Sequence, residues 1–421
     1  MNLLLIALGS HGDVHPFVGM ALRLRERGHR AVVAANGHFK PLIEGLGLEF
    51  KEVGTDADYR RLTANPALWQ AKEGFRVIFT EAMVPMLRPM YEMVRDFASA
   101  HPRSGPDRAA VVASSLGIGA RVAQDKLEVP TMSVHLAPTL FRSLYDTPII
   151  AGSPIGPGGS KILKRLAFWI ADRLVIDPMI APPLNALRRE LGLPRVTRVL
   201  RDWVHSPECT LGLFAPWFAS PQRDWPKQVR LTGFPLYDER GIEPMSDDLK
   251  RFLADGSPPI AFTPGSAMWH GGAFFEAAVA ACQLLGRRGL LLTRHRAHVP
   301  AALGKNILHV PFAPFSDLLP KCAALVHHGG IGTSSQAMCA GVPQVVMPMG
   351  YDQPDNAARM RRLGIARSIT PRAFTGLALA EQLASLLGSA EVLQACSMVA
   401  AKFAGVDGLG AACDLVERLG A

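Results

Sequence analysis

The stretch His327-His328-Gly329-Gly330-Ile331-Gly332-Thr333-Ser334 decides the fold of the region around it. An apolar run at 324–327 comes directly before it and is typical of a buried parallel strand. A helical pattern at 333–340 follows. The glycines let a ligand approach the backbone, and the free N–H groups at a helix start favour an anion, most simply a phosphate. The stretch matches neither GxxxxGK[ST] nor GxGxxG. A glycine turn without a ligand is the alternative interpretation.

Strands and helices also alternate near the amino terminus. An apolar run at 3–8, a glycine-rich turn at 9–13, a helical pattern ending at Gly28 and an apolar run at 30–35 form one β-α-β unit. Such alternation predicts open sheets with the ligand outside the carboxyl ends of the strands. The predicted fold class is α/β, with two Rossmann-like doubly wound domains facing a cleft. Further strands are predicted at 111–114, 131–135, 259–263, 290–293, 307–310 and 344–347, and further helices at 117–127, 162–176, 273–288 and 355–363.

Proline, glycine and tryptophan residues gather between 216 and 259 and indicate a boundary between domains. We expect an N-terminal domain at 1–235, a linker at 236–258 and a C-terminal domain at 259–400. A last helix at 401–421 is expected to pack back on the N-terminal domain.

The composition excludes several classes of protein. Of the 421 residues, 48% are hydrophobic and 19% charged, so the chain can bury a large core and is not disordered. The net charge of +9 is spread along the chain, which argues against a nucleic-acid-binding protein. The six cysteines form no CxxC pair, as in reduced intracellular proteins. We expect a cytoplasmic protein, with the amphipathic segment 162–176 as a candidate for peripheral contact with the inner face of a membrane.

A longer motif extends on both sides of the glycine turn. Phe312-Ala313-Pro314 lies upstream, and Gly341-Val342-Pro343 and Asp352-Gln353-Pro354-Asp355-Asn356 lie downstream. In order and spacing, this motif resembles the donor signature of the family 1 nucleotide-sugar-dependent glycosyltransferases. The resemblance covers nearly the whole chain and implies the two-domain GT-B fold, in which the N-terminal domain binds the acceptor and the C-terminal domain the nucleotide sugar. The segment 205–235 is similar to the bacterial rhamnosyltransferases of mono-rhamnolipid synthesis.

The resemblance implies a donor site without a metal ion or a cofactor. An aromatic ring at Phe312 would stack on the nucleobase, His328 would contact the diphosphate, and Asp352 would bind sugar hydroxyls. The sequence departs from the family at Phe315, where a Gln is usual, and at Gln336, where a Glu often binds ribose, so a UDP-hexose and a dTDP-hexose both stay open. The implied donor-binding residues are Gly265, Ser266, Phe312, Ala313, His328, Gly330, Gly332, Thr333, Gln336, Asp352 and Gln353.

The general base is expected in the amino-terminal loop. Asp13 aligns with the histidine that many family members use, and the aspartate that orients that histidine aligns with Ser114. Asp13 would therefore act alone, or His11 would take its place. A helix cap is the alternative role of Asp13. Asp56-Ala57-Asp58 resembles a manganese-binding Asp-x-Asp only as text.

Apolar side chains predict a hydrophobic acceptor. The methionines at 83, 86, 90 and 93 have helical spacing, which indicates either a core face or an adaptable acceptor wall. The predicted function is inverting transfer of glucose or rhamnose to a hydroxyl of a lipid-like or aromatic acceptor. The alternatives are a flavonoid, sterol or macrolide glucosyltransferase, a nucleotide-sugar 2-epimerase and a non-catalytic partner subunit; the oligomeric state stays open. The implied acceptor residues are Gly12, Ser114, Met83, Met86 and Phe168.

Overall fold

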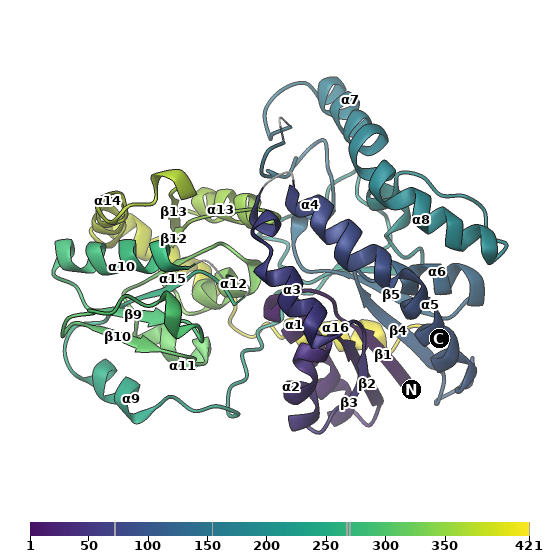
Figure 1. Ribbon diagram of the computed structural model, residues 1–421, viewed down its shortest axis with the longest axis horizontal. Coiled ribbons are helices and arrows are strands. Elements are labelled where there is room, and N and C mark those ends of the chain that lie inside the picture. Colours follow the sequence, from purple (N-terminus) through teal and green to yellow (C-terminus); the bar gives the residue numbers. More distant parts are fainter. Residues whose placement is uncertain (71–72, 154, 267, 269–270, 421) are drawn as a thin grey trace. The chain divides into compact units, whose positions relative to one another are not determined.

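A computed structural model describes residues 1–70, 73–153, 155–266, 268 and 271–420 of the chain. The chain divides into two compact units, each built around its own parallel sheet (Figure 1). The first unit comprises residues 1–235 and the carboxyl-terminal segment from Asp407 onwards, and the second comprises Leu236–Val406. The two predicted α/β domains with parallel sheets are thus confirmed.

The first unit has seven parallel strands in the order β3-β2-β1-β4-β5-β6-β7. The order reverses between β1 and β4, where a doubly wound sheet opens its ligand crevice. Because Ile6 pairs with Ala113, the loop after β1 and Ser114 at the end of β4 lie at the same edge of the sheet. The strands are β1 (Asn2–Ile6), β2 (Arg30–Ala35), β3 (Glu49–Glu52), β4 (Ala109–Ser114), β5 (Thr131–His135), β6 (Cys209–Gly212) and β7 (Val229–Leu231).

Helices surround this sheet, and the last one returns from the carboxyl terminus. Helix α16 packs against α1, where Arg27 forms ion pairs with Asp414 and Glu417. The predicted helix at 162–176 is α7 followed by a π-helical turn, η5 (Asp172–Ile176). The helices are α1 (His11–Glu26), α2 (Lys40–Gly45), α3 (Asp56–Ala64), α4 (Glu73–Val77), α5 (Val84–Ser99), α6 (Ile118–Leu127), α7 (Lys161–Ala171), α8 (Asp177–Glu190) and α16 (Gly408–Val416).

The second unit has six parallel strands in the order β10-β9-β8-β11-β12-β13. Its order reverses between β8 and β11, so the turns that follow these two strands lie side by side at the carboxyl edge. The strands are β8 (Ile260–Thr263), β9 (Gly289–Leu292), β10 (Ile307–Val310), β11 (Ala324–His327), β12 (Gln344–Val346) and β13 (Ala366–Ser368); the helices are α9 (Asp247–Ala254), α10 (Gly272–Leu285), α11 (Phe315–Leu318), α12 (Ile331–Cys339), α13 (Gln353–Arg362), α14 (Gly376–Leu387) and α15 (Ala390–Ala401).

The segment expected as a linker, 236–258, folds onto the second unit. It contains α9, whose Leu249 is fully buried in the core of that unit. The backbone N–H of Ser316 also donates to Asp238 at 2.7 Å. The boundary between the two units therefore lies near residue 235. The proline- and glycine-rich segment after it is part of the folded second unit and is not a free linker.

No single helix in the described part of the chain is long and apolar enough to cross a bilayer. Taken together, α14 and α15 have sufficient length and apolar composition, but the two helices are bent by 73° at their junction.

Candidate functional site

The glycine turn after β11 presents the start of α12. Gly330 is the N-cap residue, and Gly329 has a φ of +94°, where a Cβ would lie 2.7 Å from Val346. Glycine is therefore required at position 329. The Ser334 hydroxyl donates to the carbonyl of Gly330 at 2.9 Å and is buried, so it is engaged within the helix. The N–H groups of the first turn and half-buried Thr333 are the groups left to meet an anion.

The imidazole of His328 is held between two glycines. A Cβ on Gly265 would lie 2.8 Å from the ring and one on Gly330 would lie 2.5 Å from it, so neither position has room for a larger residue. Burial lowers the pKa of His328 to about 4, which keeps the ring neutral at neutral pH. Its Nδ1 atom has no hydrogen-bond partner among the described residues. The ring is thus a neutral group with an unused nitrogen beside the helix start.

The neighbouring His327 has a different role. It is fully buried, its Nδ1 accepts from the N–H of Gly329 at 3.1 Å, and its Nε2 donates to the side-chain oxygen of Gln344 at 2.9 Å. Because the backbone N–H fixes Nδ1 as an acceptor, the proton is on Nε2. His327 therefore positions the glycine turn and is not accessible to a ligand. The sequence analysis assigned the diphosphate contact to His328 and gave His327 no role, so the positioning role of His327 comes from the structure.

A cation covers one face of the predicted base-stacking ring. The guanidinium of Arg294 lies 4.9 Å from the centre of the half-buried Phe312 ring and is itself paired with Glu243 at 3.3 Å. Arg294, two residues after the end of β9, is thus next to a residue predicted to bind the base. Ala313 and Gln336 are buried, whereas Ser266 is exposed.

The Asp352-Gln353 pair is connected to the glycine turn through Asn356. The Asn356 amide donates to Asp352 Oδ2 at 2.7 Å and to the carbonyl of Gly329 at 3.0 Å. Gln353 is buried, and its side-chain oxygen accepts from the N–H groups of Met349 and Gly350. That oxygen stabilises the local turn, which leaves the amide nitrogen as the group of Gln353 that can contact a sugar. Half-buried Asp352 is the more accessible of the two.

In the first unit, Asp13 caps the helix that follows β1. Ser10 is the N-cap residue of α1, and its N–H and hydroxyl donate to Oδ2 of Asp13 at 2.7 and 3.0 Å. The helix begins at His11, so the N-cap residue is Ser10 and not Asp13, and Asp13 completes a capping box from the third helical position. Burial raises the pKa of Asp13, and the two bonds from Ser10 partly oppose that rise. Both bonds involve Oδ2, so Oδ1 is the oxygen that can take up a proton.

An aromatic and imidazole cluster surrounds His11. Its ring is edge-on to His38 at 5.7 Å and to Phe39 at 4.9 Å. His38 Nδ1 bonds Asp56 Oδ1 at 2.9 Å, and this bond lowers the pKa of Asp56. This His–Asp pair could not be predicted from the sequence, because its two residues are 18 positions apart on different elements and form no recognisable motif.

Asp56 and Asp58, which form the Asp-x-Asp sequence, both have structural roles at the start of α3. Asp56 also pairs with Arg60, and Asp58 accepts from Thr55 and pairs with Arg61 at the start of α3. Among the described residues, no group of three or more His, Cys, Asp or Glu side chains could hold a metal ion.

Two of the predicted acceptor residues lie in packed interiors. Met83 is buried in the core cluster of the first unit, and Phe168 is buried beneath the guanidinium of Arg142, 4.7 Å from its ring. The burial of Met83 fits the core-face alternative for the methionine spacing, and the acceptor roles of Met83 and Phe168 stay predictions. Met86 is half-buried at the edge of the same cluster and Gly12 is exposed. Ser114 is buried, and its hydroxyl has no hydrogen-bond partner among the described residues.

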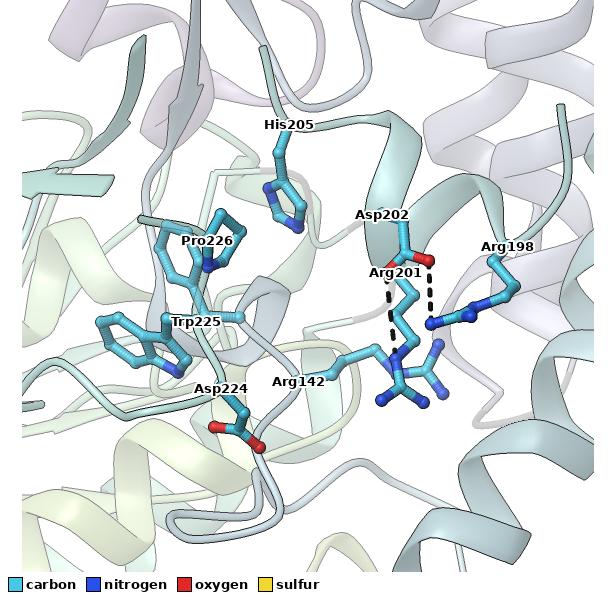
Figure 2. A pocket seen from close by; sticks show the side chains of 9 residues that line it. Arg142, Arg198, Arg201, Asp202, His205, Asp224, Trp225 and Pro226 are labelled. Carbon is cyan, nitrogen blue, oxygen red and sulfur yellow. Dashed lines mark ion pairs between the residues drawn. The ribbon is translucent and has the colours of Figure 1, made fainter. Parts of the chain in front are cut away.

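The first unit contains a cavity of about 300 Å³ that is lined by none of the predicted site residues. Figure 2 shows the side chains around it. Asp202 pairs with Arg198 at 2.8 Å and lies 3.9 Å from Arg201. Asp224 accepts from the Ser143 hydroxyl and the Leu144 N–H, both at 2.7 Å. Two arginines thus share Asp202, whereas the charge of Asp224 is stabilised by uncharged donors. Its lining consists of Phe141, Arg142, Arg198, Arg201, Asp202, His205, Asp224, Trp225 and Pro226.

Two doubly wound units, one with a neutral histidine at a glycine-rich helix start, are the arrangement expected of a GT-B glycosyltransferase. Comparison with known proteins agrees. Residues 3–97 match the glycosyltransferase family 28 N-terminal domain, and residues 290–406 match the C-terminal domain of the erythromycin biosynthesis protein CIII-like family. The O-mycaminosyltylonolide 6-deoxyallosyltransferase of Streptomyces fradiae is 33% identical over 385 residues, 89% of this chain and 86% of that protein. The chain therefore belongs to the family of GT-B glycosyltransferases that includes this deoxyallosyltransferase.

Other relatives and solved structures are consistent with this assignment. The vancomycin aglycone glucosyltransferase of Amycolatopsis orientalis is 28% identical over 87% of this chain and 85% of its own. The glycosyltransferase of kitacinnamycin has a TM-score of 0.74 at 21% identity, over 99% of this chain and 98% of that one. A spinosyn rhamnosyltransferase complexed with thymidine diphosphate has a TM-score of 0.70 at 17% identity, over 99% and 100%. These two structures support the fold alone.

Proposed function

We propose that this chain transfers a hexose, glucose or rhamnose, from a UDP- or dTDP-sugar to a hydroxyl of a hydrophobic acceptor, with inversion at the anomeric carbon. The observation that carries the proposal is the His328 ring held between Gly265 and Gly330 at the start of α12. A relative that is a deoxyallosyltransferase and a structural neighbour that binds thymidine diphosphate favour a dTDP-linked deoxysugar. Two finer assignments belong to this proposal: family 1, which rests on the motif at 312–356, and the rhamnolipid-forming subgroup, which rests on the similarity of 205–235.

In this mechanism the second unit holds the donor. As the acceptor oxygen bonds to the anomeric carbon, the bond from that carbon to the diphosphate breaks, and the diphosphate gains negative charge. The N–H groups at the start of α12 and the neutral His328 imidazole donate to that charge. Phe312, with Arg294 on one face, offers its other face to the base, and Asp352 accepts from sugar hydroxyls. No step in this proposal uses a metal ion.

The first unit supplies the base that takes the acceptor proton. Asp13 Oδ1 is the proposed acceptor of the proton, because Oδ2 is engaged by Ser10. The raised pKa of Asp13 makes its carboxylate a stronger base than an exposed aspartate. His11, on the first turn of the same helix and in contact with His38, is the alternative base. Either assignment leaves Ser114, at the neighbouring strand end, without the orienting role that the family's aspartate has.

The test is a turnover assay with a panel of donors and acceptors. UDP-glucose and dTDP-rhamnose are each offered with a 3-hydroxy fatty acid, a flavonoid, a sterol and a macrolide aglycone, with and without EDTA. The expected result is transfer from one donor, unaffected by EDTA, with an inverted anomeric centre by NMR. Conversion of a donor without any acceptor would support the epimerase instead. Donor binding without transfer to any acceptor would support a non-catalytic partner subunit.

A further inference from the structure

The outer face of α7 and η5 is apolar where a surface helix is normally polar. Of the fourteen large hydrophobic side chains exposed in the described structure, seven lie between residues 162 and 175. Ile162 is 77% exposed and Leu174 is 67% exposed. Single exposed apolar residues are ordinary, but a concentration of this kind on one helix marks an interaction surface. The seven residues, here called the α7 face, are Ile162, Leu163, Leu166, Trp169, Ile170, Leu174 and Val175.

The inner side of the same helix fixes this orientation. Lys164, Phe168 and Asp172 are buried at intervals of four residues, so they share one stripe of the helix. Lys164 Nζ donates to the carbonyl of Pro157 at 2.6 Å, and Arg142 both covers the Phe168 ring and forms an ion pair with Asp172. Polar groups are thus engaged on the inside while apolar ones point outward. In Figure 1, α7 lies at the edge of the first unit, away from its sheet.

The charges around the α7 face have one sign. Lys161, Arg165 and Arg173 are exposed, whereas Asp172, the single acidic residue between 161 and 176, is buried and paired. Lys161 also lies 3.9 Å above the ring of Tyr145, which is itself exposed. A second copy of this chain would bring the same cations together, so the pattern disfavours self-association. A negatively charged surface with an apolar interior complements it.

We propose that the α7 face is a docking surface for an anionic lipid bilayer, on which α7 and η5 lie in the plane of the interface. Apolar side chains at one face, basic residues beside them and an exposed tryptophan are the features of an interfacial helix. The sixteen residues of α7 and η5 extend about 24 Å at 1.5 Å per residue, too short to span a bilayer and suited to lying on it. This proposal is independent of the donor site, because all of its residues belong to the first unit.

Vesicle flotation of the full chain tests the proposal. The probes are vesicles of phosphatidylcholine alone and with about 30% phosphatidylglycerol, at low and high salt. The wild-type chain is expected to float with the anionic vesicles at low salt, and binding should fall at least tenfold in Trp169→Glu/Leu174→Glu. Arg165→Glu/Arg173→Glu should lose the preference for anionic lipid. The matched control is Leu284→Glu/Leu377→Glu, which alters equally exposed leucines on α10 and α14 of the second unit.

Two further readouts keep the result unambiguous. Trp169 should shift its fluorescence to shorter wavelength on vesicle binding, and Trp169→Phe should lose that shift while it still floats. Absence of flotation at low salt, or equal flotation by the wild type and Trp169→Glu/Leu174→Glu, would overturn the proposal. Concentration-dependent association without lipid that this double variant abolishes would overturn it in favour of a protein interface. Nucleotide binding should be unchanged in every variant, so failure here does not affect the proposed function.

Discussion

The ring of His328 occupies the space in which a side chain at Gly265 would have to lie, because a Cβ there would be 2.8 Å from the imidazole. The two residues belong to turns that follow neighbouring strands, β11 and β8. The predicted Gly-Ser motif and the predicted histidine turn thus meet in one place. Their contact explains why a glycine stands at 265, where φ is +99°.

Substitution of this glycine should weaken donor binding. Gly265→Ala requires a strained backbone, at a cost of about 1–3 kcal/mol, and displaces the His328 ring. We expect the affinity for the nucleotide to fall at least tenfold in calorimetry. Gly272→Ala is the control, because no atom would lie within 4 Å of its Cβ and its φ is not positive. Equal affinities of the two variants would show that the position of the ring does not matter.

The pH dependence of turnover should report the ionisation of Asp13. A base must be deprotonated, so kcat/KM should rise with pH through the raised pKa of this carboxyl, above the usual value of 3.8. Ser10→Ala removes a hydrogen bond that lowers this pKa, so the acidic limb should move to higher pH while activity persists. Asp13→Asn should lose activity by about 10²–10⁴-fold.

His11→Gln separates the two candidate bases. If Asp13 is the base, this variant keeps the acidic limb and most of its turnover. A profile that is unchanged in Ser10→Ala and abolished in His11→Gln would assign the base to His11. Thermal melts of all three variants identify losses that arise from the helix cap, which typically contributes about 1 kcal/mol.

Phe312 should contribute more to nucleotide affinity than its neighbour Phe315. Stacking of a base on an aromatic ring is worth about 1–3 kcal/mol, so Phe312→Leu should weaken UDP or dTDP binding by about tenfold or more. Phe315→Leu changes another half-buried phenylalanine, where the family usually has Gln, and should have a small effect. The reverse order in calorimetry would place the base against Phe315.

Stability should fall as the pH drops below about 6.5. Burial lowers the pKa of His205 to about 4 and that of His327 to about 3. The unfolded chain therefore binds protons at a pH where the folded chain does not, and the stability due to these neutral rings is present above about 6.5 and is lost towards 4. We expect a lower melting temperature at pH 5 than at pH 7.5. His205→Gln should flatten this dependence, because it removes a ring whose pKa is lowered by burial.

Strands with a mostly apolar sequence could be predicted, and these include β10 at the edge of the second sheet. The bounds of β2, β5, β10 and β11 agree with the predicted ranges. β3 (Glu49–Glu52) was missed because this edge strand has the sequence Glu-Phe-Lys-Glu and is mostly polar. In the region 139–200 the predicted helix at 162–176 includes η5, whereas α8 (Asp177–Glu190) was missed because it contains Pro182 and Pro183, which usually interrupt a helix.

The placement of candidate residues could be predicted where a motif maps onto one turn, as at His328 and Asp352, and their binding roles stay predictions. Contacts between distant elements, such as that between His38 and Asp56, could not be predicted. Nor could the role of a residue be predicted where its helical spacing fits two interpretations. Met83 has the spacing of a helical face, but spacing does not say whether that face meets a core or a ligand. The apolar residues of α7 were recognised, but the sequence could not show that the polar stripe is the one turned inward.

The central claim is that His328 and the start of α12 bind the diphosphate, and calorimetry of UDP and dTDP tests it most directly. The wild-type chain should bind one nucleotide in the presence of EDTA. His328→Asn should bind it at least tenfold more weakly, since the imidazole donor is lost, and His101→Asn should bind it as the wild type does. Equal affinity of His328→Asn and the wild type, or absence of binding of either nucleotide, would contradict the account.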